Sequence, residues 1–308
     1  MKILWLVLLG LWTHVLGAED KPATPAVPAL PGNEILLYDI KSLPDGLLKL
    51  EGGQNITQQP GYDSQPKFSA DGQFIFYTHA VMTDTGFQMD IWQHDLNSGK
   101  NQPYLVTAES EYSPTPLLHG PGLSVVQVDA AGDQYVVLLN NQAEPGKQSK
   151  RHSDLKQVGY FNWTQGGHLW SFVLNEHNGG DLYRQGPDMV ANKLADNVGR
   201  AFITDATAQT IHYVDMNTTP HRIHRRTAKD TTATDVMPLP MGVEDFTLDS
   251  QGRFWAGRDN TLFVSTDQRR WYIVHEFNDP NLHQITRLTT NPAADRIAIV
   301  FAEKTAAE

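Results

Sequence analysis

Seven charged side chains stand where strand-like runs of the sequence begin or end, and their types suit binding or chemistry. Guanidinium groups hold carboxylates and phosphates through paired hydrogen bonds. Because the set mixes both charges, we expect its arginines and carboxylates to pair with one another. An arginine left unpaired would suit an anionic group of a ligand or of a partner's tail. The binding candidates are Asp63, His79, Arg200, Glu244, Asp245, Arg258 and Arg287.

The familiar catalytic and metal-binding motifs are absent from the sequence. It contains no Gly-X-Ser-X-Gly motif of serine hydrolases, no His-Glu-X-X-His zinc motif and no phosphate loop ending in Gly-Lys-Ser or Gly-Lys-Thr. It also contains no cysteine, which excludes disulfides and thiolate metal sites. We therefore predict no catalytic residue, no metal ligand and no cofactor.

Composition narrows the classes of partner. The chain has 308 residues and a formal net charge of −11. Because nucleic-acid binding requires clustered cations to neutralise phosphates, a chain this acidic is not expected to bind nucleic acid.

The N-terminus has the pattern of an export signal. A short positive start is followed by an apolar run and small residues near position 18, which predicts a signal peptide over residues 1–18. An uncleaved anchor is the alternative, although the run is short for a membrane span. Residues 19–33 form a proline-rich leader, and the folded domain is expected over residues 34–308. Export without disulfides fits a bacterial periplasm, so we predict a periplasmic protein with no stable membrane span after cleavage.

The elements that must position the charged residues are short strands in repeating units. The first unit has a strand ending at Phe68, a turn at residues 71–72, and further strands from Phe74, over 90–96 and over 103–106. Equivalent turns recur near residues 122, 167, 209, 252 and 295, at intervals of about 42 to 50 residues, which is typical of β-propeller blades. The pattern predicts an all-β, six-bladed β-propeller with four-stranded blades, with seven blades as the alternative.

The last unit supplies only two strands, over residues 285–288 and 296–301. Two further strands without partners, over residues 34–40 and 46–50, stand at the beginning of the predicted domain. Joining the two pairs would complete the sixth blade, close the ring and protect the sheet edges.

Residues 79–89 form an unusually long link in the first unit. The link carries Met82, Phe87 and Met89. It is expected either to cover the mouth of the channel or meet a partner, or simply to pack over the first blade.

Two stretches carry a family resemblance. Residues 66–72, Pro-Lys-Phe-Ser-Ala-Asp-Gly, and residues 90–100, Asp-Ile-Trp-Gln-His-Asp-Leu-Asn-Ser-Gly-Lys, resemble the WD40-like (PD40-type) repeat of TolB-like periplasmic propellers. The resemblance implies a protein-interaction module of the cell envelope. TolB itself has a separate α/β domain before its propeller, whereas here the proline-rich leader occupies that place.

Two functions remain open from the sequence. The first is a non-enzymatic periplasmic propeller that binds an envelope protein or peptide. The alternative is a metal-dependent hydrolase of the six-bladed lactonase type, in which acidic residues around the channel hold a divalent metal such as calcium. Converging, unpaired carboxylates at the channel would favour the enzyme, whereas arginine-rich or ion-paired walls would favour binding.

Overall fold

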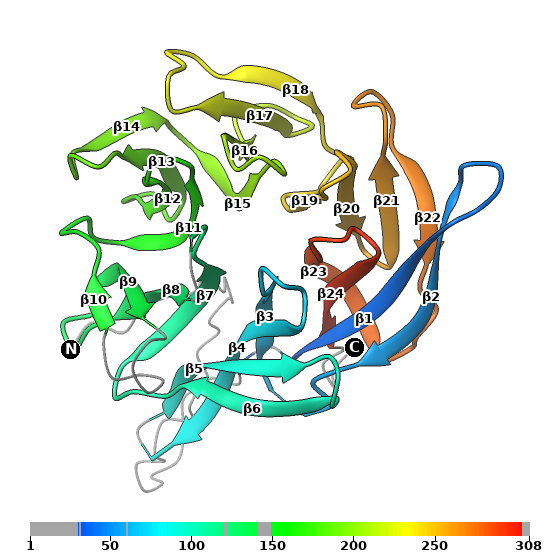
Figure 1. Ribbon diagram of the computed structural model, residues 1–308, viewed down its shortest axis with the longest axis horizontal. Coiled ribbons are helices and arrows are strands. Elements are labelled where there is room, and N and C mark those ends of the chain that lie inside the picture. The colour runs from blue at the N-terminus through cyan, green and yellow to red at the C-terminus, as the bar shows by residue number, and fades with distance from the viewer. Residues whose placement is uncertain are drawn as a thin grey trace, which may run out of the picture.

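The structure is a computed structural model that describes residues 30, 32–59, 61–84, 86–119, 122–140 and 149–303. The predicted signal peptide and nearly all of the leader lie outside these residues. The described chain forms six four-stranded antiparallel sheets arranged as blades around a centre (Figure 1). This confirms the predicted all-β, six-bladed propeller. In the described part of the chain, no helix is long and apolar enough to cross a membrane.

The first three blades follow one another along the chain, each from its innermost to its outermost strand. The first blade consists of β3 (Asp63–Phe68), β4 (Phe74–Thr83), β5 (Gly86–Asp95) and β6 (Lys100–Leu105). The second consists of β7 (Ser110–Pro116), β8 (Gly122–Val128), β9 (Gln134–Asn140) and β10 (Ser149–Arg151). The third consists of β11 (Val158–Thr164), β12 (His168–Leu174), β13 (Gly180–Gln185) and β14 (Ala191–Ala195).

The last three blades complete the ring. The fourth consists of β15 (Val198–Thr204), β16 (Thr210–Asp215), β17 (Arg222–Thr227) and β18 (Thr234–Pro238). The fifth consists of β19 (Phe246–Leu248), β20 (Phe254–Arg258), β21 (Thr261–Ser265) and β22 (Tyr272–Glu276). The sixth consists of β23 (Leu282–Thr290), β24 (Arg296–Glu303), β1 (Asn33–Ser42) and β2 (Leu48–Asn55).

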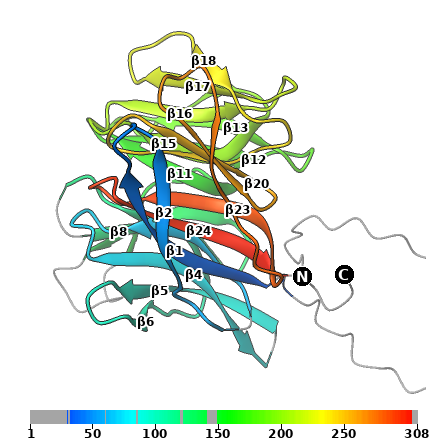
Figure 2. The same ribbon diagram turned by 90° about the vertical axis from the view of Figure 1, so that its right-hand side faces the viewer.

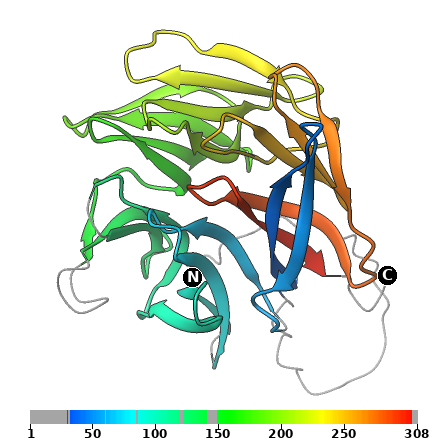
Figure 3. The ribbon, with the colours of Figure 1, turned by 45° about the vertical axis from the view of Figure 1, so that its right-hand side comes forward.

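The sixth blade joins the two ends of the described chain. β1 pairs antiparallel with β24, from Asn33 opposite Ala302 to Asp39 opposite Arg296. Figures 2 and 3 show β1 and β2 beside β23 and β24. Apolar side chains fill both faces of this junction, and Ile35 is fully buried. The predicted closure of the ring is confirmed.

The apolar core is divided among the junctions between blades. Each of the six buried clusters in the described chain combines side chains from two neighbouring blades. At the junction of the fifth and sixth blades, for example, Trp255 packs with Leu36 and Phe301. Burial of these large side chains is the main force that holds the blades side by side.

Five of the six innermost strands contain register shifts. In the first four blades they fall between Ser64 and Lys67 in β3, Tyr112 and Thr115 in β7, Val158 and Tyr160 in β11, and Val198 and Phe202 in β15. β23 has two, between Leu282 and Gln284 and between Ile285 and Arg287. A bulge leaves an extra residue outside the ladder and changes the direction of the side chains beside it. The innermost strands therefore present residues to the channel that a regular alternation would place elsewhere.

Residues 79–89 do not form the long link that the sequence suggested. β4 continues to Thr83 and β5 begins at Gly86, so the segment belongs to a long hairpin at the lower edge of Figure 1. Ala80 faces Met89 and Met82 faces Phe87 across the ladder. Backbone pairing thus satisfies this segment, and Met82 remains 63% exposed near the tip.

Candidate functional site

A small cavity in the channel is lined by residues of every blade. Its volume is about 70 Å³, and its polar walls come mainly from Gln65, Lys67, Ser113, Tyr160, Arg200, Asp245 and Arg287. Six of these residues lie within or beside a register shift: Gln65, Lys67, Ser113, Tyr160, Arg200 and Arg287. The bulged innermost strands therefore build the site.

Arg287 is the best-anchored cation of the channel. Its Nη1 donates a hydrogen bond of 2.7 Å to Asp245 Oδ2, and its Nη2 donates one of 2.8 Å to the hydroxyl oxygen of Tyr160. The guanidinium carbon lies 4.8 Å from the centre of the Tyr160 ring. Arg287 therefore links the third blade to the residue that precedes the fifth.

Arg200 approaches the same carboxylate from the fourth blade but is less completely bonded. Its Nη2 donates a hydrogen bond of 3.2 Å to the carbonyl oxygen of Thr286. Its Nε lies 3.6 Å from Asp245 Oδ2, which is an ion pair but too long for a hydrogen bond. That Nε atom is buried and has no hydrogen-bond partner. The Arg200 guanidinium is thus less completely bonded than that of Arg287.

Lys67 brings a third cation to the cavity from the first blade. Among the described residues, no hydrogen bond or ion pair is formed by its ammonium group. Burial lowers the pKa of Lys67; the attraction of Asp245 opposes this effect, and the repulsion of Arg287 adds to it. The cavity therefore brings three basic side chains around a single carboxylate, in a protein whose formal net charge is −11.

Tyrosine hydroxyls surround the cationic centre. Burial would raise the pKa of Tyr160, but Arg287 and Arg200 outweigh it, so this pKa is lowered. Burial raises the pKa of Tyr62. Tyr160 adds to this rise, and Arg287 and Arg200 oppose it. Burial raises the pKa of Tyr112 to about 12. The neighbouring arginines therefore favour the ionised form of Tyr160.

The candidates named from the sequence do not form one rim. Asp245, Arg200 and Arg287 meet in the channel as described. Glu244 is exposed beside them. Arg258 lies outside the cavity, 3.8 Å from Asp259 and over the ring of Phe263. Arg258 therefore pairs within its own hairpin.

Asp63 and His79 form a separate buried pair in the first blade. His79 Nδ1 lies 2.7 Å from Asp63 Oδ1, and both side chains are largely buried. Burial raises the pKa of Asp63, His79 opposes the rise, and Glu34 adds to it. This pair joins β3 to β4 and does not line the cavity.

A second buried carboxyl lies at the beginning of β7. Glu111 is fully buried, and its Oε1 accepts hydrogen bonds of 2.5 Å from Thr107 Oγ1 and 3.0 Å from Gln127 Nε2. Its Oε2 has no partner. Burial raises the pKa of Glu111 to about 7, with hydrogen bonds opposing the rise and Asp90 adding to it.

Two central residues of the cavity, Lys67 and Tyr160, were not among the candidates from the sequence. Lys67 lies within the repeat motif at residues 66–72, where it reads as part of a strand and turn. Their common signal is the bulge beside each of them, and a bulge leaves no reliable mark in a single sequence. In the described part of the chain, no three His, Cys, Asp or Glu side chains are placed to hold a metal ion together.

Comparison with known proteins identifies the fold. No family model matches the sequence, and no curated protein matches it. Among solved structures, a TolB-type protein from Agrobacterium tumefaciens has a TM-score of 0.69 at 12% identity, over 89% of this chain and 99% of that one. TolB from Acinetobacter baumannii has a TM-score of 0.56 at 12% identity, over 88% of this chain and 65% of that one.

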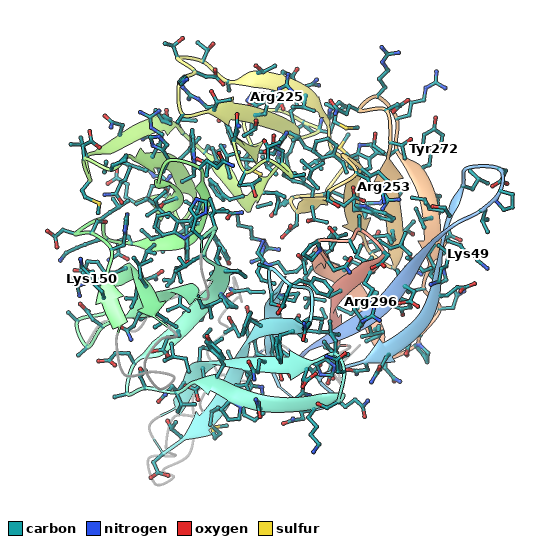
Figure 4. All side chains as sticks on the ribbon, in the orientation of Figure 1. Lys49, Lys150, Arg225, Arg253, Tyr272 and Arg296 are labelled. Atoms are coloured by element: carbon teal, nitrogen blue, oxygen red, sulfur yellow. The ribbon has the colours of Figure 1, made fainter. Side chains whose placement is uncertain are left out.

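An enzyme shares the same architecture. A gluconolactonase from Xanthomonas campestris has a TM-score of 0.57 at 12% identity, over 90% of this chain and 98% of that one. At these identities the similarities establish the propeller fold and leave the function to be argued from the channel. Figure 4, which views the ring of blades face-on, shows Lys49, Lys150 and Arg225 on strands away from the centre.

Proposed function

We propose that this protein is a non-enzymatic, TolB-like periplasmic propeller with PD40-type repeats, which binds a protein or peptide of the bacterial cell envelope. The observation that carries the proposal is the meeting of Lys67, Arg200 and Arg287 around Asp245 in the channel. Three cations close together repel a divalent metal ion and attract an anionic group. The channel is therefore suited to holding part of a partner and poorly suited to metal-dependent hydrolysis.

The sequence supports the location. Residues 1–18 have the pattern of an export signal, and export without disulfides fits a bacterial periplasm. The propeller similarity to TolB proteins is compatible with an envelope role. Cell fractionation of the tagged full-length protein, with N-terminal sequencing of the mature product, would test both the location and the cleavage site.

Partner binding is tested by chemical crosslinking in intact cells, followed by affinity purification of the tagged protein. We expect a crosslinked partner with the native chain and with Arg258→Met, because Arg258 does not line the cavity. We expect the partner to be lost with Arg200→Met, provided that the variant unfolds at a similar temperature. Equal recovery with both variants would contradict binding through the channel.

The alternative function is a metal-dependent hydrolase of the lactonase type, and the fold shared with gluconolactonase is the observation that favours it. The two functions differ in metal content. We expect the protein purified without chelators to contain less than stoichiometric calcium, zinc or manganese by plasma emission spectrometry. A bound metal at one equivalent, together with lactone hydrolysis, would favour the enzyme.

A further inference from the structure

The channel contains more basic side chains than carboxylates that could neutralise them. Asp245 Oδ2 is the one carboxylate oxygen that both Arg200 and Arg287 approach among the described residues, at 3.6 and 2.7 Å. Lys67 has no ion-pair partner in that part of the chain. Buried charges are normally paired, because an unpaired one loses its hydration without compensation. The site therefore has the charge balance of a receptor for an added anion.

The unused hydrogen-bond donors of the site agree with this balance. Arg200 Nε is buried and donates to no acceptor. A buried donor without a partner costs free energy, and such a group in a folded protein requires an explanation. The Nε atom is itself closed off from the cavity, but the Arg200 side chain is 37% exposed, so an anionic oxygen there would accept from its exposed terminal nitrogens and from the Lys67 ammonium. One added group would thus contact both residues.

The three basic residues come from separate blades and surround the cavity. The space between them limits the size of the added anionic group. Lys67 belongs to the first blade, Arg200 to the fourth and Arg287 to the sixth, so they border one cavity from different sides. Its volume of about 70 Å³ corresponds to roughly two water molecules. A carboxylate group fits such a space.

The position of the cavity along the channel fixes how the group must arrive. Arg200 lies two residues after the beginning of β15 and four before its end, so at roughly 3.3 Å per residue it is about 7 Å from one end of the strand and about 13 Å from the other. A short side chain on a partner's surface loop reaches this depth less readily than a chain end does. An extended chain end is thin enough, and the Tyr160 ring in the cavity wall offers a planar surface against which it packs.

We propose that this cavity binds a terminal carboxylate, supplied by the C-terminus of a partner polypeptide that enters the channel, and held by Lys67, Arg200 and Arg287. The inference rests on the proposed function, since it names the chemical group of the partner that the channel recognises. Asp245 holds Arg287 in place and disfavours more strongly charged anions by repulsion. The main-chain amides of the entering peptide carry no charge. The site therefore distinguishes a free C-terminus from a blocked one by the charge of the carboxylate.

The test uses the full-length purified protein and two matched probes. Acetyl-Tyr-Ala-Ala with a free C-terminus and the same tripeptide with a C-terminal amide are titrated by isothermal calorimetry at low salt. We expect the free acid to bind at least tenfold more tightly than the amide. Inorganic phosphate and acetate serve as further probes. Equal affinity for acid and amide, tighter binding of phosphate, or equal binding of acetate would each overturn the proposal.

Variants locate the site. We expect Lys67→Met to reduce affinity for the free acid at least tenfold and to leave affinity for the amide unchanged, with Arg258→Met as the matched control. Because Lys67→Met replaces an ammonium group with an apolar end of similar length, near-ultraviolet circular dichroism verifies folding. If that variant unfolds, Arg200→Lys gives the same comparison, since it keeps the charge and removes the planar donor. If the substitution leaves the affinity for the free acid unchanged, the assignment of the site is wrong.

The two proposals fail in different ways. If a partner is crosslinked in cells but the purified protein does not distinguish acid from amide, partner binding stands and the carboxylate site is wrong. If the free acid binds through Lys67 but no partner is crosslinked, the carboxylate site stands and the envelope role is wrong.

Discussion

Arg287 Nη1 lies 2.7 Å from Asp245 Oδ2, so the sixth blade is bonded to the residue that leads into the fifth. The two residues are 42 positions apart in the chain, about one blade repeat. Arg200 shares the same carboxylate oxygen from the fourth blade at 3.6 Å. Asp245 therefore moderates the repulsion between cations that the ring brings together.

Replacing Asp245 with Asn should destabilise the protein and make its stability depend on anions. Removing one partner of a largely buried ion pair costs about 3 kcal/mol, because the remaining cations then face each other without a carboxylate. We expect sulfate to recover part of the loss by occupying the cavity. The measurement is urea unfolding with and without sulfate. Asp259→Asn, beside the exposed Arg258, is the matched control and should change little.

The closure of the ring could be predicted because strand pairing leaves strong local signals. Ile35 and Leu36 stand in an apolar run whose one neighbouring strand in sequence covers only one of its edges, and residues 296–301 are in the same position at the other end. Two buried strands that each have one free edge can complete their hydrogen bonding by pairing with each other. The structure pairs them directly.

The content of the channel could be predicted only in part. The turn spacing placed Arg200, Asp245 and Arg287 in comparable positions of different repeats. Lys67 and Tyr160 were missed because side-chain direction follows the pleat until a bulge changes it. Arg258 stays away from the cavity, because its hairpin is regular and its side chain packs over Phe263.

Shortening Ile35 should weaken the closure of the ring. Ile35 is fully buried and packs between the sixth and first blades with Ile75 and Val300. Ile35→Ala leaves a cavity there and should lower the free energy of unfolding by about 3 kcal/mol. Leu47→Ala, at a side chain that is 60% exposed, is the control. Similar unfolding midpoints for the two variants would show that the β1–β24 junction contributes little.

Asp249 should be the most sensitive polar residue of the fifth blade. Its Oδ2 accepts hydrogen bonds from Arg253 Nε at 2.5 Å and Trp255 Nε1 at 2.8 Å, and its side chain is fully buried. Asp249→Asn leaves Arg253 without its anion, so we expect a loss of about 3 kcal/mol. Asp267→Asn changes the same residue type in an exposed turn of this blade. Differential scanning calorimetry should show a large shift for the first variant and a much smaller one for the second.

Glu111 should make the protein less stable as the pH rises. Its pKa is about 7 in the folded chain and 4.5 in its ordinary range, so between these values the folded state binds more protons than the unfolded state. The stability present below pH 4.5 is therefore lost progressively up to about pH 7, by about 3 kcal/mol in total. Glu111→Gln keeps an acceptor for Gln127 and cannot ionise. We expect this variant to match the native chain near pH 4.5 and to exceed it at pH 8 in urea unfolding, whereas Glu176→Gln, at an exposed turn, should follow the native chain at both pH values. A native-like pH profile for Glu111→Gln would assign the slope to other buried groups.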